Sequence, residues 1–76
     1  MGTLTLKTKD GSLIGMRQID PLYWIKAGGS FDTEFANQSL PKEAREKGTK
    51  VVSVTPNIKR TKNSIDVDVV CIVEWL

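Results

Sequence analysis

The C-terminal segment Ser64–Leu76 has the clearest hydrophobic pattern in the chain. Its side chains alternate in character, as in a strand, where successive residues point to opposite faces of a sheet. One face carries only apolar side chains, namely Ile65, Val67, Val69, Cys71, Val73 and Trp75. The other face is polar at its ends and apolar in the middle, in the order Asp66, Asp68, Val70, Ile72 and Glu74. This pattern predicts a strand buried on one face along its length and on both faces near its middle.

Two hairpins are predicted, one at each end of the chain. Residues 3–9 alternate between polar and apolar, and Asp10-Gly11 follows, a dipeptide favoured in two-residue hairpin turns. Residues 12–19 are expected to return as the second strand, with Gly15 at a bulge or a close backbone approach. The valine-rich segment around residues 51–55 favours a strand, and the connection to the last strand is short. Strands 50–58 and 64–75 are therefore expected to pair antiparallel.

The middle of the chain allows two interpretations. Asp20-Pro21 has the form of an N-cap followed by proline at the first helical position, which favours a helix over residues 22–27 that ends at Gly28. The alternative is a hairpin in which residues 22–27 turn at Gly28-Gly29 into residues 30–35. The character of residues 30–38 is ambiguous. Residues 41–47 predict a short surface helix that opens at Pro41 and ends at Gly48.

These elements predict an α+β fold in a single domain, residues 1–76. The expected order is β-β-α-α-β-β, with short helices on one face of a small four-stranded, mostly antiparallel sheet. The alternative is a small all-β barrel of SH3-like or OB-like character.

Composition narrows the classes of function. The 76 residues include no histidine and a single cysteine, Cys71, so a zinc site, a disulfide framework and histidine-dependent catalysis lack their usual side chains. We therefore expect no enzyme activity and no cofactor. The N-terminus does not have the apolar core of a signal peptide, and no apolar run approaches a membrane span. A free thiol without disulfides predicts a reducing, cytoplasmic setting.

Positive charge is concentrated in one region. The net charge is only +2, but residues 41–62 hold seven Lys/Arg against two Glu, a local balance of +5. Nucleic acid is therefore an alternative partner, bound through phosphate contacts from the basic tip of the last hairpin, Lys59, Arg60 and Lys62, extended by Arg45 and Lys50. The absence of aromatic residues between Phe35 and Trp75 argues against this alternative. The cations also have a simpler explanation, since charge keeps a hairpin soluble and prevents edge pairing.

Two further features have a functional and a structural interpretation. Asp66 and Asp68 share one face of a strand, about 7 Å apart, and two carboxylates at that spacing are a candidate Mg²⁺ site of a metal-dependent hydrolase. The structural alternative is that these acids pair with the cations across the hairpin. Cys71 lies between valines on the apolar face, where a thiol behaves as a small inert hydrophobic group.

The aromatic residues supply the hypothesis we favour from the sequence. Adjacent side chains cannot both point into a core, so one of Tyr23 and Trp24 is expected at the surface, and Trp75 ends the last strand. Exposed Tyr and Trp are enriched at protein interfaces. The sequence therefore favours a non-catalytic, soluble interaction module that binds another protein, or a second copy of itself, through Tyr23, Trp24 and Trp75.

Overall fold

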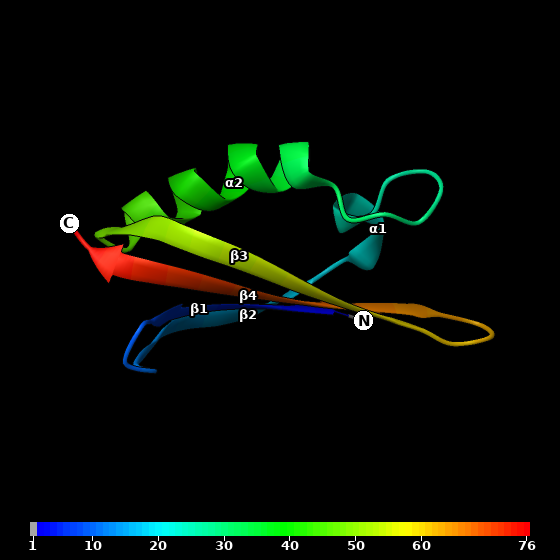
Figure 1. Cartoon of the computed structure of the whole chain (residues 1–76), viewed down its shortest axis with the longest axis horizontal. Helices are drawn as coiled ribbons and strands as arrows, with labels where there is room; N and C mark the ends of the chain where they lie inside the picture. The colour runs from blue at the N-terminus through cyan, green and yellow to red at the C-terminus, as the bar shows by residue number, and fades with distance from the viewer. Residues whose placement is uncertain (1) are drawn as a thin grey trace.

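A computed structural model describes residues 2–76 of the chain as four strands and two helices (Figure 1). In chain order the elements are β1 (Gly2–Thr8), β2 (Leu13–Ile19), α1 (Pro21–Trp24), α2 (Thr33–Glu46), β3 (Thr49–Arg60) and β4 (Ile65–Trp75). The predicted α+β class and the order of the elements are confirmed.

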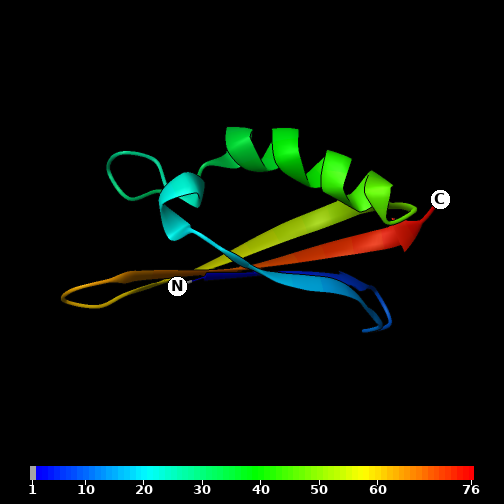
Figure 2. The same ribbon diagram turned by 180° about the vertical axis from the view of Figure 1, so that it is seen from behind.

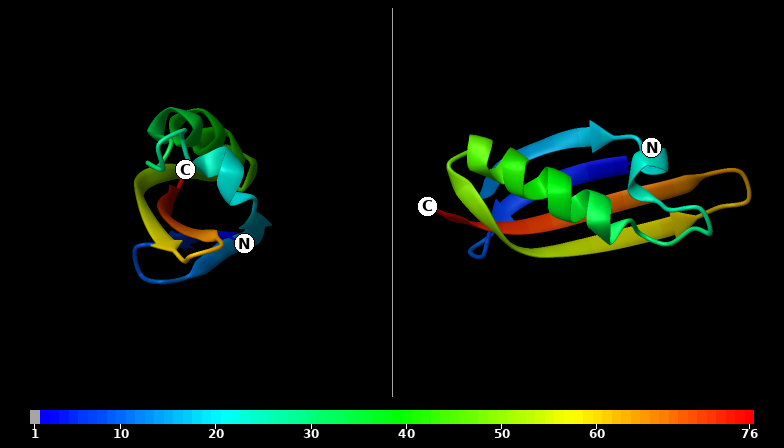
Figure 3. Two further views of the ribbon diagram at one scale, coloured as in Figure 1. Left: turned by 90° about the vertical axis from the view of Figure 1, so that its right-hand side faces the viewer. Right: turned by 90° about the horizontal axis from the view of Figure 1, so that it is seen from above.

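The four strands form one open sheet in the order β2-β1-β4-β3. The hairpins β1/β2 and β3/β4 are antiparallel as predicted, but the central strands β1 and β4 run parallel, so the sheet is mixed. Parallel neighbours need a crossover connection, and α2 lies within it, on one face of the sheet (Figure 1 and Figure 3). The barrel alternative is wrong, because the sheet stays open and helices cover one of its faces. Among residues 2–76, no helix covers the opposite face (Figure 2).

The first hairpin follows the predicted pattern closely. Gly11 adopts a φ of 92° in the turn, a conformation that glycine tolerates and that other residues rarely adopt. The register shifts between Leu6 and Lys7, which pair with Gly15 and Leu13, so Ile14 is the extra residue of a bulge. Gly15 therefore lies beside the irregularity that its sequence position indicated.

The segment after β2 combines the two interpretations of the middle region. Asp20 caps α1 by accepting a hydrogen bond from the Leu22 backbone N–H at 3.1 Å, and Pro21 occupies the first turn as predicted. The helix then ends at Trp24, three residues earlier than expected. Ile25 is already extended and forms an isolated antiparallel bridge with Phe31, so the next residues turn back as a small hairpin-like loop.

Helix α2 begins well before the predicted start at Pro41. Asp32 accepts a hydrogen bond from the Phe35 N–H at 3.0 Å and caps the helix, and Pro41 lies inside it. A proline in a helix interior removes one backbone hydrogen bond and costs about 3 kcal/mol. The helix continues through it because Ala36, Leu40 and Ala44, spaced by four residues, are fully buried against the sheet.

The core fills the space between α2 and the sheet. Leu4 and Leu6 of β1 meet the inward face of β4, where the whole predicted row from Val67 to Val73 is buried. Trp24 completes this core near α1. Its ring stacks on Phe31, with centroids 6.1 Å apart, and meets Phe35 edge-on at 5.0 Å.

Candidate binding pocket at the hairpin end

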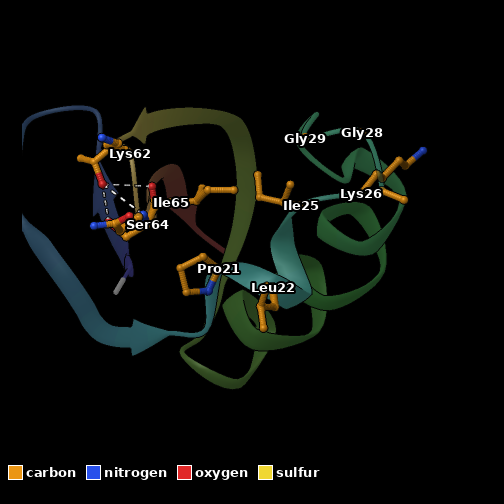
Figure 4. A pocket seen from close by; sticks show the side chains of 12 residues that line it. Pro21, Leu22, Ile25, Lys26, Gly28, Gly29, Lys62, Ser64 and Ile65 are labelled. Carbon is orange, nitrogen blue, oxygen red and sulfur yellow. Dashed lines mark hydrogen bonds between the residues drawn. The ribbon is translucent and has the colours of Figure 1, made fainter.

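The β3/β4 hairpin extends beyond the rest of the sheet. β1 pairs with β4 only from Asp68 onward, whereas β3 and β4 stay paired out to Arg60 and Ile65. The loop of residues 25–31 lies on the helix side of this extension, seen at the right of Figure 1. Between the loop and the hairpin tip is an open pocket of about 800 Å³, which we call the end pocket (Figure 4). Its lining comes from two segments, residues 21–29 except 23 and 24, and residues 61–65.

Local hydrogen bonds shape both walls of the end pocket. In the loop wall, the Lys26 N–H donates to the Ser30 carbonyl at 2.8 Å, and the Gly29 N–H donates to the Lys26 carbonyl at 2.9 Å. In the hairpin wall, the Thr61 N–H donates to the Ser64 carbonyl at 2.9 Å, and the Ser64 N–H donates to Thr61 Oγ1 at 3.1 Å. Each wall therefore contains a turn that is closed by hydrogen bonds between residues close in sequence.

Arg60 joins the two walls. Its guanidinium donates a hydrogen bond to the backbone carbonyl of Gly29, 31 residues away in the chain. Gly29 has a φ of 86°, and a Cβ atom there would lie 2.6 Å from the Arg60 guanidinium. The positive φ favours glycine at this position, whereas the Arg60 guanidinium is the end of a flexible side chain that could move away from a Cβ atom. The contact connects the loop wall to β3.

The lining combines an apolar centre with a basic margin. Pro21, Leu22, Ile25 and Ile65 provide the apolar surface, and Leu22 is 81% exposed. In Figure 4, Ile25 and Ile65 point toward one another from the two walls, while Lys26 and Lys62 lie at opposite margins. None of the twelve described lining residues is acidic. The end pocket can therefore accept an apolar group and place a negative charge near two ammonium groups.

The structure separates the three aromatic residues predicted to form an interface. Tyr23 is 69% exposed on α1, next to the end pocket, and Trp75 is 64% exposed at the opposite end of the molecule. Trp24 is only 3% exposed and belongs to the core, so its assignment as a contact residue is wrong. The expectation that one member of the Tyr23-Trp24 pair reaches the surface is confirmed.

The predicted basic surface is also divided. Arg60 and Lys62 lie at the hairpin tip beside the end pocket, and Lys59 precedes them on the other face of β3. Lys50 lies near the start of β3, about 30 Å from Lys59 by strand rise, and Arg45 lies in the last turn of α2. Lys50 Nζ is 2.9 Å from a carboxylate oxygen of Glu74, and this hydrogen bond lowers the pKa of Glu74. The five cations do not form one patch.

The two acidic residues on β4 have different neighbours, and only the position of Asp66 agrees with the predicted pairing across the hairpin, since Asp68 lies opposite Asn57. Asp68 accepts a hydrogen bond from Thr3 Oγ1 at 2.6 Å, and Asp66 lies directly opposite Lys59 in the antiparallel register. Within residues 2–76, no group of three or more His, Cys, Asp or Glu side chains could hold a metal ion. Among the described residues, the fold therefore brings no third acidic, His or Cys ligand to Asp66 and Asp68.

Cys71 is fully buried in the centre of the sheet, as its position between valines predicted. Burial raises the pKa of its thiol to about 11, and the negative charge of Glu43 adds to this shift. The thiol is therefore neutral at physiological pH, and it lies away from the end pocket.

A second exposed surface lies at the sheet edge formed by β2. Met16 is 62% exposed on the uncovered face, with Leu13 also exposed, and Thr5 and Lys7 of β1 lie between them and the half-buried Val70 and Ile72 of β4. The other edge, β3, contains Pro56 and a register shift at Val52. Proline cannot donate a ladder hydrogen bond, so Pro56 protects β3 against strand addition. Both edge strands contain a bulge, but β2 contains no proline.

The end pocket was not predicted from the sequence. The sequence predicts that Gly28 ends a helix or that Gly28-Gly29 forms a hairpin turn, and a turn is observed, but the opposite wall comes from residues more than 30 positions later. Comparisons with protein-family models, curated proteins and solved structures gave no match to this chain. Among residues 2–76, neither helix has the length and apolarity needed to cross a membrane.

Proposed function

We propose that this chain is a non-catalytic protein-binding module that contacts its partner through the end pocket and the adjacent face of α1. The main support for the proposal is that Leu22 and Tyr23 are exposed at an open, largely apolar pocket with a volume of about 800 Å³. Large apolar side chains that remain exposed next to a pocket are typical of binding sites, where burial by a partner stabilises the complex.

The chemistry of the lining supports binding over catalysis. Its polar side chains are the ammonium groups of Lys26 and Lys62, the hydroxyls of Thr61 and Ser64, and the amide of Asn63. Both hydroxyls already take part in hydrogen bonds within the hairpin turn. A nucleophile next to a general base, the arrangement that activates hydroxyl groups, is not present in this set.

Selection of peptides from a random display library on the immobilised protein tests the proposal. We expect enriched peptides whose affinity falls at least about tenfold when Leu22→Asp places a charge in the apolar centre. Leu22 is exposed, so the substitution should leave the fold intact, and unchanged thermal unfolding would verify this. Leu13→Asp, an equally drastic change at the exposed β2 edge, is the matched control. Peptides that bind the Leu22→Asp variant as well as the original chain would contradict the proposal.

A second candidate function is self-association through β2. The specific observation in its favour is the difference between the edges, since β3 contains Pro56, whereas β2 contains no proline and is regular from Gly15 to Ile19 after its bulge at Ile14. Two copies could pair their β2 strands antiparallel around a twofold axis and bring their Met16 side chains together. This association is independent of the end pocket, which lies beyond the end of β2.

A further inference from the structure

Building on the protein-binding function proposed above, we propose that the end pocket recognises a short acidic peptide segment that carries one large apolar side chain. The apolar side chain would enter between Leu22, Ile25 and Ile65. Carboxylates of flanking residues would then face Lys26 and Lys62 on the two margins.

Charge complementarity is the first argument. Lys26 and Lys62 line the end pocket, and the Arg60 guanidinium lies beside it at the Gly29 carbonyl, so three cations are on this side of the sheet. Lys59 is on the other face of β3, opposite Asp66. The carboxylates nearest in sequence have roles within the fold. Asp20 caps Leu22, Asp32 caps Phe35, and Asp66 lies opposite Lys59. A local excess of positive charge attracts acidic segments and raises their association rate.

The geometry of the cations adds selectivity. The Arg60 guanidinium donates to the Gly29 carbonyl at the edge of the loop wall, so its charge lies beside the end pocket. Lys26 and Lys62 are exposed and extend from opposite walls, one on each side of the apolar centre (Figure 4). A ligand with a single negative charge at one end could pair with only one of these two ammonium groups. A segment with acids on both sides of an apolar residue would satisfy both.

The size and character of the lining favour a peptide over nucleic acid. The volume of about 800 Å³ exceeds that of one side chain and suits a segment of a few residues. The twelve lining residues include no aromatic ring, and Tyr23 on α1 is a single exposed ring beside them, whereas single-strand binding normally combines cations with several rings on which successive bases stack. The apolar surface would instead stabilise an aliphatic or aromatic side chain of a peptide.

Fluorescence polarisation with three labelled probes tests the inference. The probes are a short peptide with a central tryptophan flanked by glutamates, its counterpart with glutamines, and a single-stranded oligo-dT. We expect the glutamate peptide to bind at least about tenfold more tightly than the glutamine peptide, with affinity that falls as salt increases. Lys26→Gln and Lys62→Gln should each weaken it about two- to fivefold, the effect of one exposed ion pair.

Lys9→Gln is the matched control, because Lys9 is exposed in the β1/β2 turn at the opposite end of the molecule. Equal effects of Lys9→Gln and Lys26→Gln would overturn the inference, since the net charge of the protein would then explain the binding.

Equal binding of the glutamate and glutamine peptides, lost in Leu22→Asp, would overturn the acidic preference and leave the protein-binding function in place. Tighter binding of oligo-dT than of the glutamate peptide would assign the cations to nucleic acid. Failure of the display selection to yield peptides sensitive to Leu22→Asp would contradict the protein-binding function itself.

Discussion

At the scale of single residues, Cys71 connects burial to pH dependence. The thiol is fully buried, and its pKa is raised to about 11, while an unfolded chain has a cysteine pKa of about 8.5. Below pH 8 the thiol is protonated in both states and adds no pH dependence. Between about pH 9 and 11 the unfolded state loses this proton and the folded state keeps it. The free energy of unfolding therefore decreases as pH rises through this range.

Urea unfolding of the original chain and of Cys71→Ala across pH 7–11 measures this contribution. We expect the difference between the two stabilities to be constant below pH 8 and to narrow above pH 9, by up to about 1.4 kcal/mol per pH unit. Cys71→Ala lacks the thiol but keeps every other titratable group, so the difference between the two proteins reports the thiol alone. A constant difference up to pH 11 would show that the thiol ionises in the folded state.

At the scale of elements, Pro41 is a local defect within α2. Its ring leaves the carbonyl of Asn37, four residues earlier, without the usual helical donor. Pro41→Ala restores this donor, although it also gives the unfolded chain about 1 kcal/mol more conformational entropy. We expect a net gain of about 1–2 kcal/mol in the free energy of unfolding, because the penalty for proline in a helix interior is about 3 kcal/mol.

Thermal unfolding is the measurement for this helix. A gain of 1 kcal/mol raises the Tm of a domain of this size by about 4–8 °C. Gln38→Ala, at an exposed position of the same helix, should change the Tm much less and controls for helix propensity alone. A lower Tm for Pro41→Ala would mean that the proline ring makes packing contacts that outweigh the missing hydrogen bond.

The loop of residues 25–31 depends on a different kind of contact. Arg60 connects this loop to β3 through the Gly29 carbonyl, so Arg60→Met should release the loop while keeping most of the apolar stem. Loss of a hydrogen bond from a charged group at an exposed site corresponds to about 1 kcal/mol. We expect the Gly29 amide, which donates to Lys26, to exchange with solvent about fivefold faster in hydrogen-exchange measurements. Lys59→Met is the control, and equal exchange in both variants would argue against the connecting role.

The elements recovered from the sequence are those whose signals are local. The alternation around Val67–Val73, the Asp10-Gly11 turn and the Asp20 cap all act within a few residues, and each predicted the observed structure. The extent of α2 was not recovered, because the burial of Ala36, Leu40 and Ala44 against the sheet outweighs the local signal of Pro41. Tertiary packing decides such boundaries.

The same reasoning explains why the candidate site was only partly predicted. Tyr23 and the cations of the hairpin tip were singled out, but the end pocket arises where two turns more than 30 residues apart meet. Nothing in the sequence pattern of one turn indicates that it lies close to the other turn in the folded chain. The parallel pairing of β1 with β4 was missed for a related reason, since it joins the two ends of the chain rather than neighbouring segments.

At the scale of the whole molecule, the sheet has two unequal edges and one uncovered face. Helix α2 packs nearer to β3, and β3 carries Pro56 and a bulge. β2 has a bulge at Ile14 but no proline, and its exposed Met16 lies on the uncovered face beside Thr5 of β1. A small domain also has a limited core, so pairing of its open edge would add stability that the single chain does not supply.

Self-association through β2 is therefore expected, but it should be weak, because a seven-residue strand offers an interface smaller than that of stable dimers. Light-scattering mass measured over a range of concentrations should rise from the monomer toward twice its value. Gln18→Pro removes a backbone donor from β2, and Met16→Lys places like charges together at the twofold axis, so both should keep the chain monomeric. Val52→Lys at the protected β3 edge should leave the association unchanged. A mass that stays monomeric at every concentration, or that falls equally with the β3 substitution, would contradict the assignment of β2 as the open edge.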